Sequence, residues 1–103
     1  MKGTFDRSTT PATLRLEGGL EIDSAAELQA RLLEALHAGE PMAVGLEGIT
    51  EVDAIGLQLL TAAERAARAR GGAWVRSGSL PESLRRAAED AGWERVPFEG
   101  EAQ

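Results

Sequence analysis

The sequence contains no cysteine, which excludes disulfide bonds, thiolate metal sites and a cysteine nucleophile. Its aromatic residues are limited to two Trp and two Phe, too few for a surface on which nucleic acid bases stack. A formal net charge of −6 opposes binding to nucleic acid phosphates or to anionic lipid surfaces. There is no secretory signal pattern and no apolar run long enough to cross a bilayer. We therefore expect a cytoplasmic protein that is not embedded in a membrane and does not bind nucleic acid.

Patterns that would indicate catalysis or cofactor binding are also missing. The only histidine, His37, is expected in the last turn of a helix, and no nucleophile or carboxylate is spaced to work with it. The glycines match neither a phosphate-binding loop nor a dinucleotide-binding loop, and no metal ligands occur at short spacing. We expect no enzymatic activity, no cofactor and no metal site.

Hydrophobic periodicity predicts strands that alternate with helices. We expect strands at residues 4–6, 12–18, 41–49 and 72–78, and a further edge strand at 94–98. We expect helices at residues 24–38, 53–71 and 79–92. This order predicts one α/β domain over residues 1–103, with a mixed four- to five-stranded sheet and helices packed mainly on one side. Residues 12–97 are its expected core, and residues 1–11 and 98–103 are its peripheral ends.

The helix starts carry recognisable capping signals. Ser24 with Glu27 and Ser79 with Glu82 match the S-x-x-E capping box, in which side chains bond the first backbone N–H groups.

Asp53 is placed to cap the second helix, whose apolar stripe we expect to comprise Ile55, Leu59, Ala62 and Ala66. Gly56 in the first turn costs up to about 1 kcal/mol relative to alanine, which suggests that a neighbouring loop or a partner approaches closely there.

At these residues the sequence resembles the STAS domain, the fold of anti-sigma-factor antagonists. The resemblance runs through "LRLEGGLEIDSAAELQARL", "VGLEGITEVDAIGLQLLTAAERAARARGGAWVRSGS" and "SLPESLRRAAEDAGWERV". It implies a non-catalytic domain that binds a kinase-like anti-sigma partner and is switched off by phosphorylation of a serine in a D-S-S-G-L segment. Asp53, Gly56 and Leu57 match that segment, but its serines correspond to Ala54 and Ile55. The phosphoacceptor position is then Ile55, which has no hydroxyl.

The leading hypothesis is a protein-interaction module of a bacterial regulatory system that docks on a kinase-like or anti-sigma-type partner without phosphorylation at the usual serine. The expected partner-binding residues are Asp23, Ser24, Asp53, Ala54, Ile55, Gly56 and Leu57. Ile55 either contacts the partner or begins the buried stripe of its helix. Alternative functions are a STAS subunit that docks on the ATPase of a phospholipid-transport ABC complex and a sensor of a nucleotide or lipid. Homodimerisation also stays open, because the edge strand at 4–6 and an apolar Ile55 both need cover.

Overall fold

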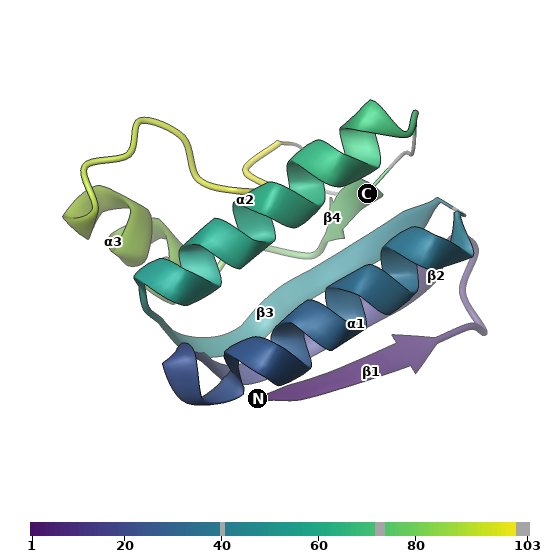
Figure 1. The fold of residues 1–103 in the computed structure, drawn as a ribbon, viewed down its shortest axis with the longest axis horizontal. Coiled ribbons are helices and arrows are strands. Elements are labelled where there is room, and N and C mark those ends of the chain that lie inside the picture. Colours follow the sequence, from purple (N-terminus) through teal and green to yellow (C-terminus); the bar gives the residue numbers. More distant parts are fainter. Residues whose placement is uncertain (40, 72–73, 101–103) are drawn as a thin grey trace.

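Within residues 1–39, 41–71 and 74–100, which the computed structural model describes, four strands form one sheet in the order β1–β2–β3–β4 (Figure 1). The strands are β1 (Lys2–Asp6), β2 (Ala12–Leu20), β3 (Met42–Val52) and β4 (Trp74–Ser77). Strand β1 runs antiparallel to β2, whereas β2, β3 and β4 run parallel to one another. The expected mixed sheet is therefore confirmed with four strands.

The helices follow the parallel strands, as crossover connections require. They are α1 (Ala25–Ala38), α2 (Ala54–Ala69) and α3 (Glu82–Asp90), and a short 3₁₀ turn, η1 (Ile22–Ser24), precedes α1. Figure 1 shows α1 and α2 side by side across one face of the sheet, with α3 at the end where α2 begins. The expected packing of helices mainly on one side is confirmed.

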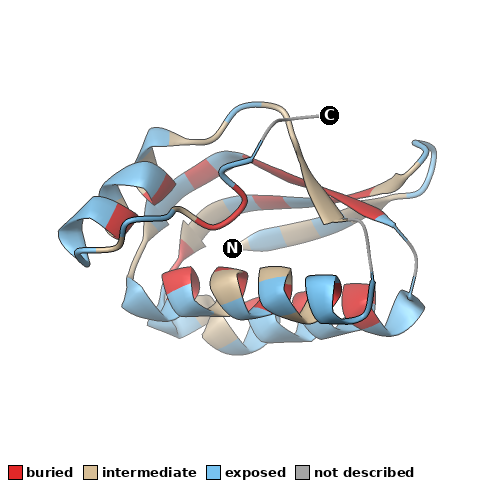
Figure 2. Ribbon diagram, turned by 90° about the horizontal axis from the view of Figure 1, so that it is seen from above, coloured by how far each residue is buried: buried red, intermediate tan, exposed pale blue. Residues whose placement is uncertain are grey.

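The core lies between this helix layer and the sheet, where Figure 2 shows most of the buried residues. Strand β2 alternates as the sequence predicts: Leu14 and Leu16 are fully buried, whereas Arg15 and Glu17 are exposed on the opposite face. In α2 the expected stripe is wrong. The buried residues are Gly56, Leu57, Leu60, Ala63 and Ala67. Alanines and leucines surround this helix on most sides, so periodicity alone does not identify the inward face.

Helix α3 begins later than expected, and its predicted capping box is absent. Its N-cap is Pro81, which makes no side-chain capping bond, and the helix starts at Glu82. Proline carries no N–H to donate, and its fixed φ is compatible with the start of a helix, so α3 begins directly after Pro81 and not at Ser79. The hydroxyl that contributes instead is that of Ser83, which donates to the backbone oxygen of Ile49 at 2.7 Å and ties α3 to β3. Residues 72 and 73 of the expected fourth strand lie outside the described residues.

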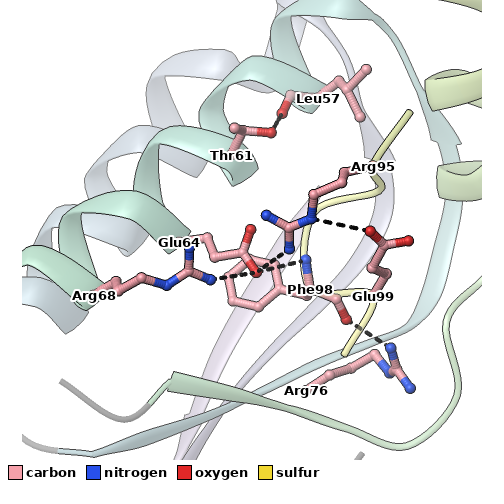
Figure 3. Close-up of polar contacts among 8 residues, drawn as sticks. All are labelled: Leu57, Thr61, Glu64, Arg68, Arg76, Arg95, Phe98 and Glu99. Atoms are coloured by element: carbon pink, nitrogen blue, oxygen red, sulfur yellow. Dashed lines mark hydrogen bonds and ion pairs between the residues drawn. The ribbon is translucent and has the colours of Figure 1, made fainter. Parts of the chain in front are cut away.

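The expected edge strand at 94–98 is wrong, because residues 91–100 form turns and bends. Phe98, which we expected in a peripheral end, is 3% exposed and belongs to the hydrophobic core. Side chains bond its backbone where a strand partner would: its N–H donates to Oε2 of Glu64 at 3.1 Å, and its C=O accepts from Nη1 of Arg76 at 2.7 Å (Figure 3). Its φ of 62° turns the chain there, which an extended strand does not allow.

Candidate functional site

Asp53 joins two segments that are far apart in the sequence. Its Oδ1 accepts the N–H of Gly56 at 3.0 Å and so caps α2, and its Oδ2 accepts the N–H of Ile22 at 2.8 Å. Its own N–H donates to the backbone oxygen of Leu20 at 3.1 Å. The carboxylate therefore holds the turn before α1 against the start of α2. We call this surface, comprising residues 21–24 and 51–56, the α2 mouth.

The register of the parallel strands explains why these segments meet. Gly19 pairs with Glu51 and Leu20 pairs with Val52, so β2 and β3 end together at one edge of the sheet. In open parallel sheets, ligands and partners commonly bind beyond the carboxyl ends of the strands. The α2 mouth occupies this position.

The structure shows which group lies close to Gly56. A Cβ added to Gly56 would lie 2.3 Å from the backbone oxygen of Leu20 and 2.8 Å from the Leu20 Cβ. The close neighbour is therefore the end of β2 and not an external partner. Glycine at this position lets α2 start directly against the sheet edge.

The expected partner-binding residues divide into exposed and buried groups. Asp23, Ala54 and Ile55 are exposed, and Ser24 and Asp53 are half-buried. Leu57 is 1% exposed and Gly56 is buried, so both face the interior. They pack beneath the exposed residues and cannot contact a partner directly. Ile55 is 38% exposed, and the alternative in which it begins the buried face of α2 is wrong.

The structure adds a residue that the sequence did not single out. Ile22 is 70% exposed, more than Leu33 or Ile55, the other large apolar side chains exposed in the described residues. Its backbone is bonded to the same carboxylate that caps the helix of Ile55. An apolar residue within the polar stretch "EIDS" is the only signal that could have indicated it. The mouth thus presents two exposed isoleucines.

Ser24 has a different role from the one expected. It makes no capping bond to α1; its hydroxyl donates to the backbone oxygens of Gly19 at 2.9 Å or Glu21 at 3.1 Å and accepts the Glu21 N–H at 3.2 Å. The capping box pairs Ser24 with Glu21 around η1, one turn before the predicted Ser24–Glu27 pair. A 3₁₀ turn precedes α1, so the orphan N–H groups to be capped are those of the turn. The Ser24 hydroxyl is engaged in holding the mouth.

The charge of the mouth is negative. The nearby charge of Glu51 raises the pKa of the Glu21 carboxyl above its usual value, as do partial desolvation, a hydrogen bond with Glu51, and the charges of Asp53 and Asp23. Ionised carboxylates repel one another here, so a cation brought to this rim would relieve the repulsion. The surface is suited to a partner that combines apolar side chains with positive charge.

The first two residues of α2 carry no nucleophilic side chain. Ala54 and Ile55 at the start of α2 carry no hydroxyl, thiol or amine. Among the residues whose positions are described, no group of three His, Asp or Glu side chains could hold a metal ion. No helix in those same ranges is long and apolar enough to cross a membrane.

A concavity of about 600 Å³ lies between α2 and the C-terminal segment. Glu64, 14% exposed at its side chain, sits in its wall, with Nη2 atoms of Arg68 and Arg95 each 3.9 Å from its Oε2 (Figure 3). Thr61 donates its hydroxyl to the backbone oxygen of Leu57 at 3.0 Å. Glu64 binds Arg95 and the Phe98 N–H and so fastens the segment that carries Phe98 to α2, whereas the Thr61 bond stays within the helix. Both roles are structural.

Comparison with known proteins agrees with this architecture. Residues 4–98 match a family model described as "Mlab, STAS domain". The fold is similar to the unphosphorylated anti-sigma factor antagonist SpoIIAA, with a TM-score of 0.62 and 19% identity over 89% of this chain and 86% of that one. It is also similar to a crystal structure of Mglu, with a TM-score of 0.63 and 17% identity over 74% of this chain. The aligned part is 19% of the Mglu chain. No curated protein matches the chain.

The two structural likenesses, at these identities, show the fold alone. The family model covers all three helices and nearly the whole sheet, including the α2 mouth. This chain belongs to the STAS domain family, and that membership supports a regulatory protein-interaction domain in general.

Proposed function

We propose that the chain is a non-catalytic interaction module that docks through the α2 mouth on a kinase-like or anti-sigma-type regulatory protein. The observation that carries the proposal is the Asp53 carboxylate, which bonds Ile22 and Gly56 together and so holds Ile22 and Ile55 at one surface. Exposed large apolar side chains that are fixed in position are typical anchors of protein interfaces. The contact residues are Ile22, Asp23, Ala54 and Ile55, and Ser24, Asp53, Gly56 and Leu57 position them.

The docking is constitutive in this proposal. A phosphoryl group adds about −1.5 to −2 charges, and at the mouth it would join an already negative rim. Neither Ala54 nor Ile55 has an oxygen that could accept it. The resemblance to the D-S-S-G-L segment places the usual acceptor at Ile55, so the regulatory step of that segment is absent while the apolar contact is kept.

Titration calorimetry with a purified partner tests the proposal. The partner to be titrated is a purified kinase-like anti-sigma protein. Ile22→Glu and Ile55→Glu should each raise Kd at least about tenfold, because a charged side chain would be buried at an apolar contact. Leu33→Glu is the matched control, since it places the same charge at an exposed apolar position on α1, outside the mouth. Wild-type affinity in both mouth variants, with unchanged circular dichroism, would show that the mouth is not the docking surface.

Incubation with the kinase-like partner and ATP tests the missing switch separately. Mass spectrometry should detect no phosphate on residues 51–57 of the wild-type chain. Ile55→Ser restores a hydroxyl at the first turn of α2 and should become an acceptor. Phosphate on Thr50 or Ser24 in the wild-type chain would contradict constitutive docking.

A second partner class is the ATPase of a phospholipid-transport ABC complex. The lack of a hydroxyl at both Ala54 and Ile55 favours it, because a permanent subunit needs a fixed contact and no phosphorylation switch. Titration with the purified ATPase of such a complex distinguishes the two classes. Binding of the ATPase and not of the kinase-like protein, with the same loss in Ile22→Glu, would assign the chain to transport.

A further inference from the structure

An apolar groove of about 160 Å³ runs between the outer sides of α1 and α2, away from the sheet. Gln29 is the only polar residue that lines it. The others are Leu32, Leu33, Leu36, Leu59, Ala62, Ala63 and Ala66. The groove is not part of the α2 mouth, and none of the contacts described above explains it.

The groove has a large residue on one helix and small residues on the other. Leu33 stands on the α1 rim and is 44% exposed. Ala62 is exposed on α2, and its small side chain leaves a shallow depression in the surface of that helix. Ala66, on the next turn, is half-buried in the groove. A leucine from another molecule fits such a place, and small residues let two helices approach closely.

The charges on this face are also divided between the helices. Glu34 is on α1, with a side chain that is 51% exposed, and Arg65 is exposed on α2. Both helices run in the same direction, because each returns between parallel strands. Glu34 is the tenth residue of α1, and Arg65 is the twelfth residue of α2. At a rise of about 1.5 Å per residue, their distances from the starts of their own helices differ by only about 3 Å. The face is therefore complementary to itself in shape and in charge.

We propose that two copies of this chain associate through the α1–α2 face. The two-fold axis lies parallel to the helices, so that α1 of each copy packs on α2 of the other. This arrangement brings Leu33 to the small residues around Ala62 of the second copy and Glu34 to Arg65, each contact occurring twice. Glu34 already pairs with Arg31 in its own chain at 3.0 Å, and its carboxylate has capacity to accept a second guanidinium.

Charge selects this axis over the other two-fold arrangement. An axis perpendicular to the helices would place α1 against α1, with the carboxylates of Glu27 and Glu34 facing those of the other copy. Ile22 projects from the turn before α1, so the association leaves it accessible. The pairing is thus independent of docking at the α2 mouth.

Sedimentation velocity over a range of concentrations is the test. Wild type should show a concentration-dependent dimer. Leu33→Glu should raise the dimer Kd at least about tenfold, since it would bury an unpaired carboxylate. Ile22→Glu is the matched control and should leave the Kd unchanged. Glu34→Arg and Arg65→Glu should each weaken the dimer, and the double variant should restore it, because the two charges have exchanged places.

Cross-linking gives a second readout that does not depend on destabilising the dimer. The chain has no cysteine, so Glu34→Cys and Arg65→Cys each introduce one reactive thiol. A short bismaleimide added to an equimolar mixture should link the two variants to each other in preference to themselves. Wild type that stays monomeric up to about 1 mM, a concentration at which even weak association is visible, would overturn the proposal. Equal cross-linking of like and unlike variants, or a failed charge exchange, would refute the pairing of α1 with α2.

Discussion

Gly56→Ala should destabilise the protein although alanine is the better helix former. The new Cβ would be 2.3 Å from the Leu20 oxygen, against about 3.3 Å for an unstrained C···O contact. The nearest atoms are the backbone carbonyl and the Cβ of Leu20, which no side-chain rotation can move away, and overpacking of this kind costs about 1–3 kcal/mol. Moving the Leu20 carbonyl also weakens its bond from the Asp53 N–H, at about 1 kcal/mol. Helix propensity offsets about 1 kcal/mol, which leaves a net loss of about 1–3 kcal/mol.

Urea and thermal denaturation followed by circular dichroism measure this loss. For a domain of this size the expected fall in Tm is about 5–20 °C. Gly100→Ala is the matched control, because its added methyl group meets no atom of the described residues within 4 Å and stability should not change. A Gly56→Ala variant that is equally or more stable than wild type would refute the reasoning, since that is the outcome expected if helix propensity alone acts at an uncrowded position.

Two further predictions concern carboxylates. The charge of Glu51 raises the pKa of Glu21, so the folded protein favours protonated Glu21; the resulting stability is present below the unfolded-state pKa and is lost as pH rises through the folded-state pKa. Glu21→Gln should therefore raise Tm at pH 7 and make no difference below about pH 4, and equal pH profiles of Tm would contradict this. Glu64→Ala leaves the N–H of Phe98 without its acceptor and should cost about 1–3 kcal/mol. Trypsin should then cleave after Arg95 faster than in wild type, and an unchanged cleavage rate would show that Glu64 does not hold the segment.

Local signals in the sequence were sufficient for most elements of the fold. Residues 12–18 alternate between apolar and polar, and residues 24–38 have a helical period. Each pattern reflects one face packed on a neighbouring layer, so each predicted its element correctly. The cap at Asp53 was predictable for the same reason, because the Gly56 N–H that it accepts is three residues away. The inward face of α2 was not predictable, since alanine on several sides of a helix gives no preferred direction.

The residues that sequence reasoning missed are those whose partners lie far along the chain. Ile22 becomes part of the mouth only because its N–H bonds a carboxylate 31 positions away. Phe98 enters the core because Glu64, 34 positions away, binds its backbone. No local sequence pattern encodes these long-range hydrogen bonds. They form only when strand pairing has brought the two segments together.

By itself, the sequence determined an α/β domain with a capped helix and no hydroxyl at Ala54 or Ile55, because periodicity, capping and side-chain chemistry are local properties. The STAS family followed from resemblance and is shown by the family model. Only the tertiary structure decided that Gly56 accommodates the end of β2, that Leu57 is buried, and that Ile22 joins Ile55 at the surface. The physical reason is the register of β2 and β3, which ends both strands at one edge and brings their loops within hydrogen-bonding distance.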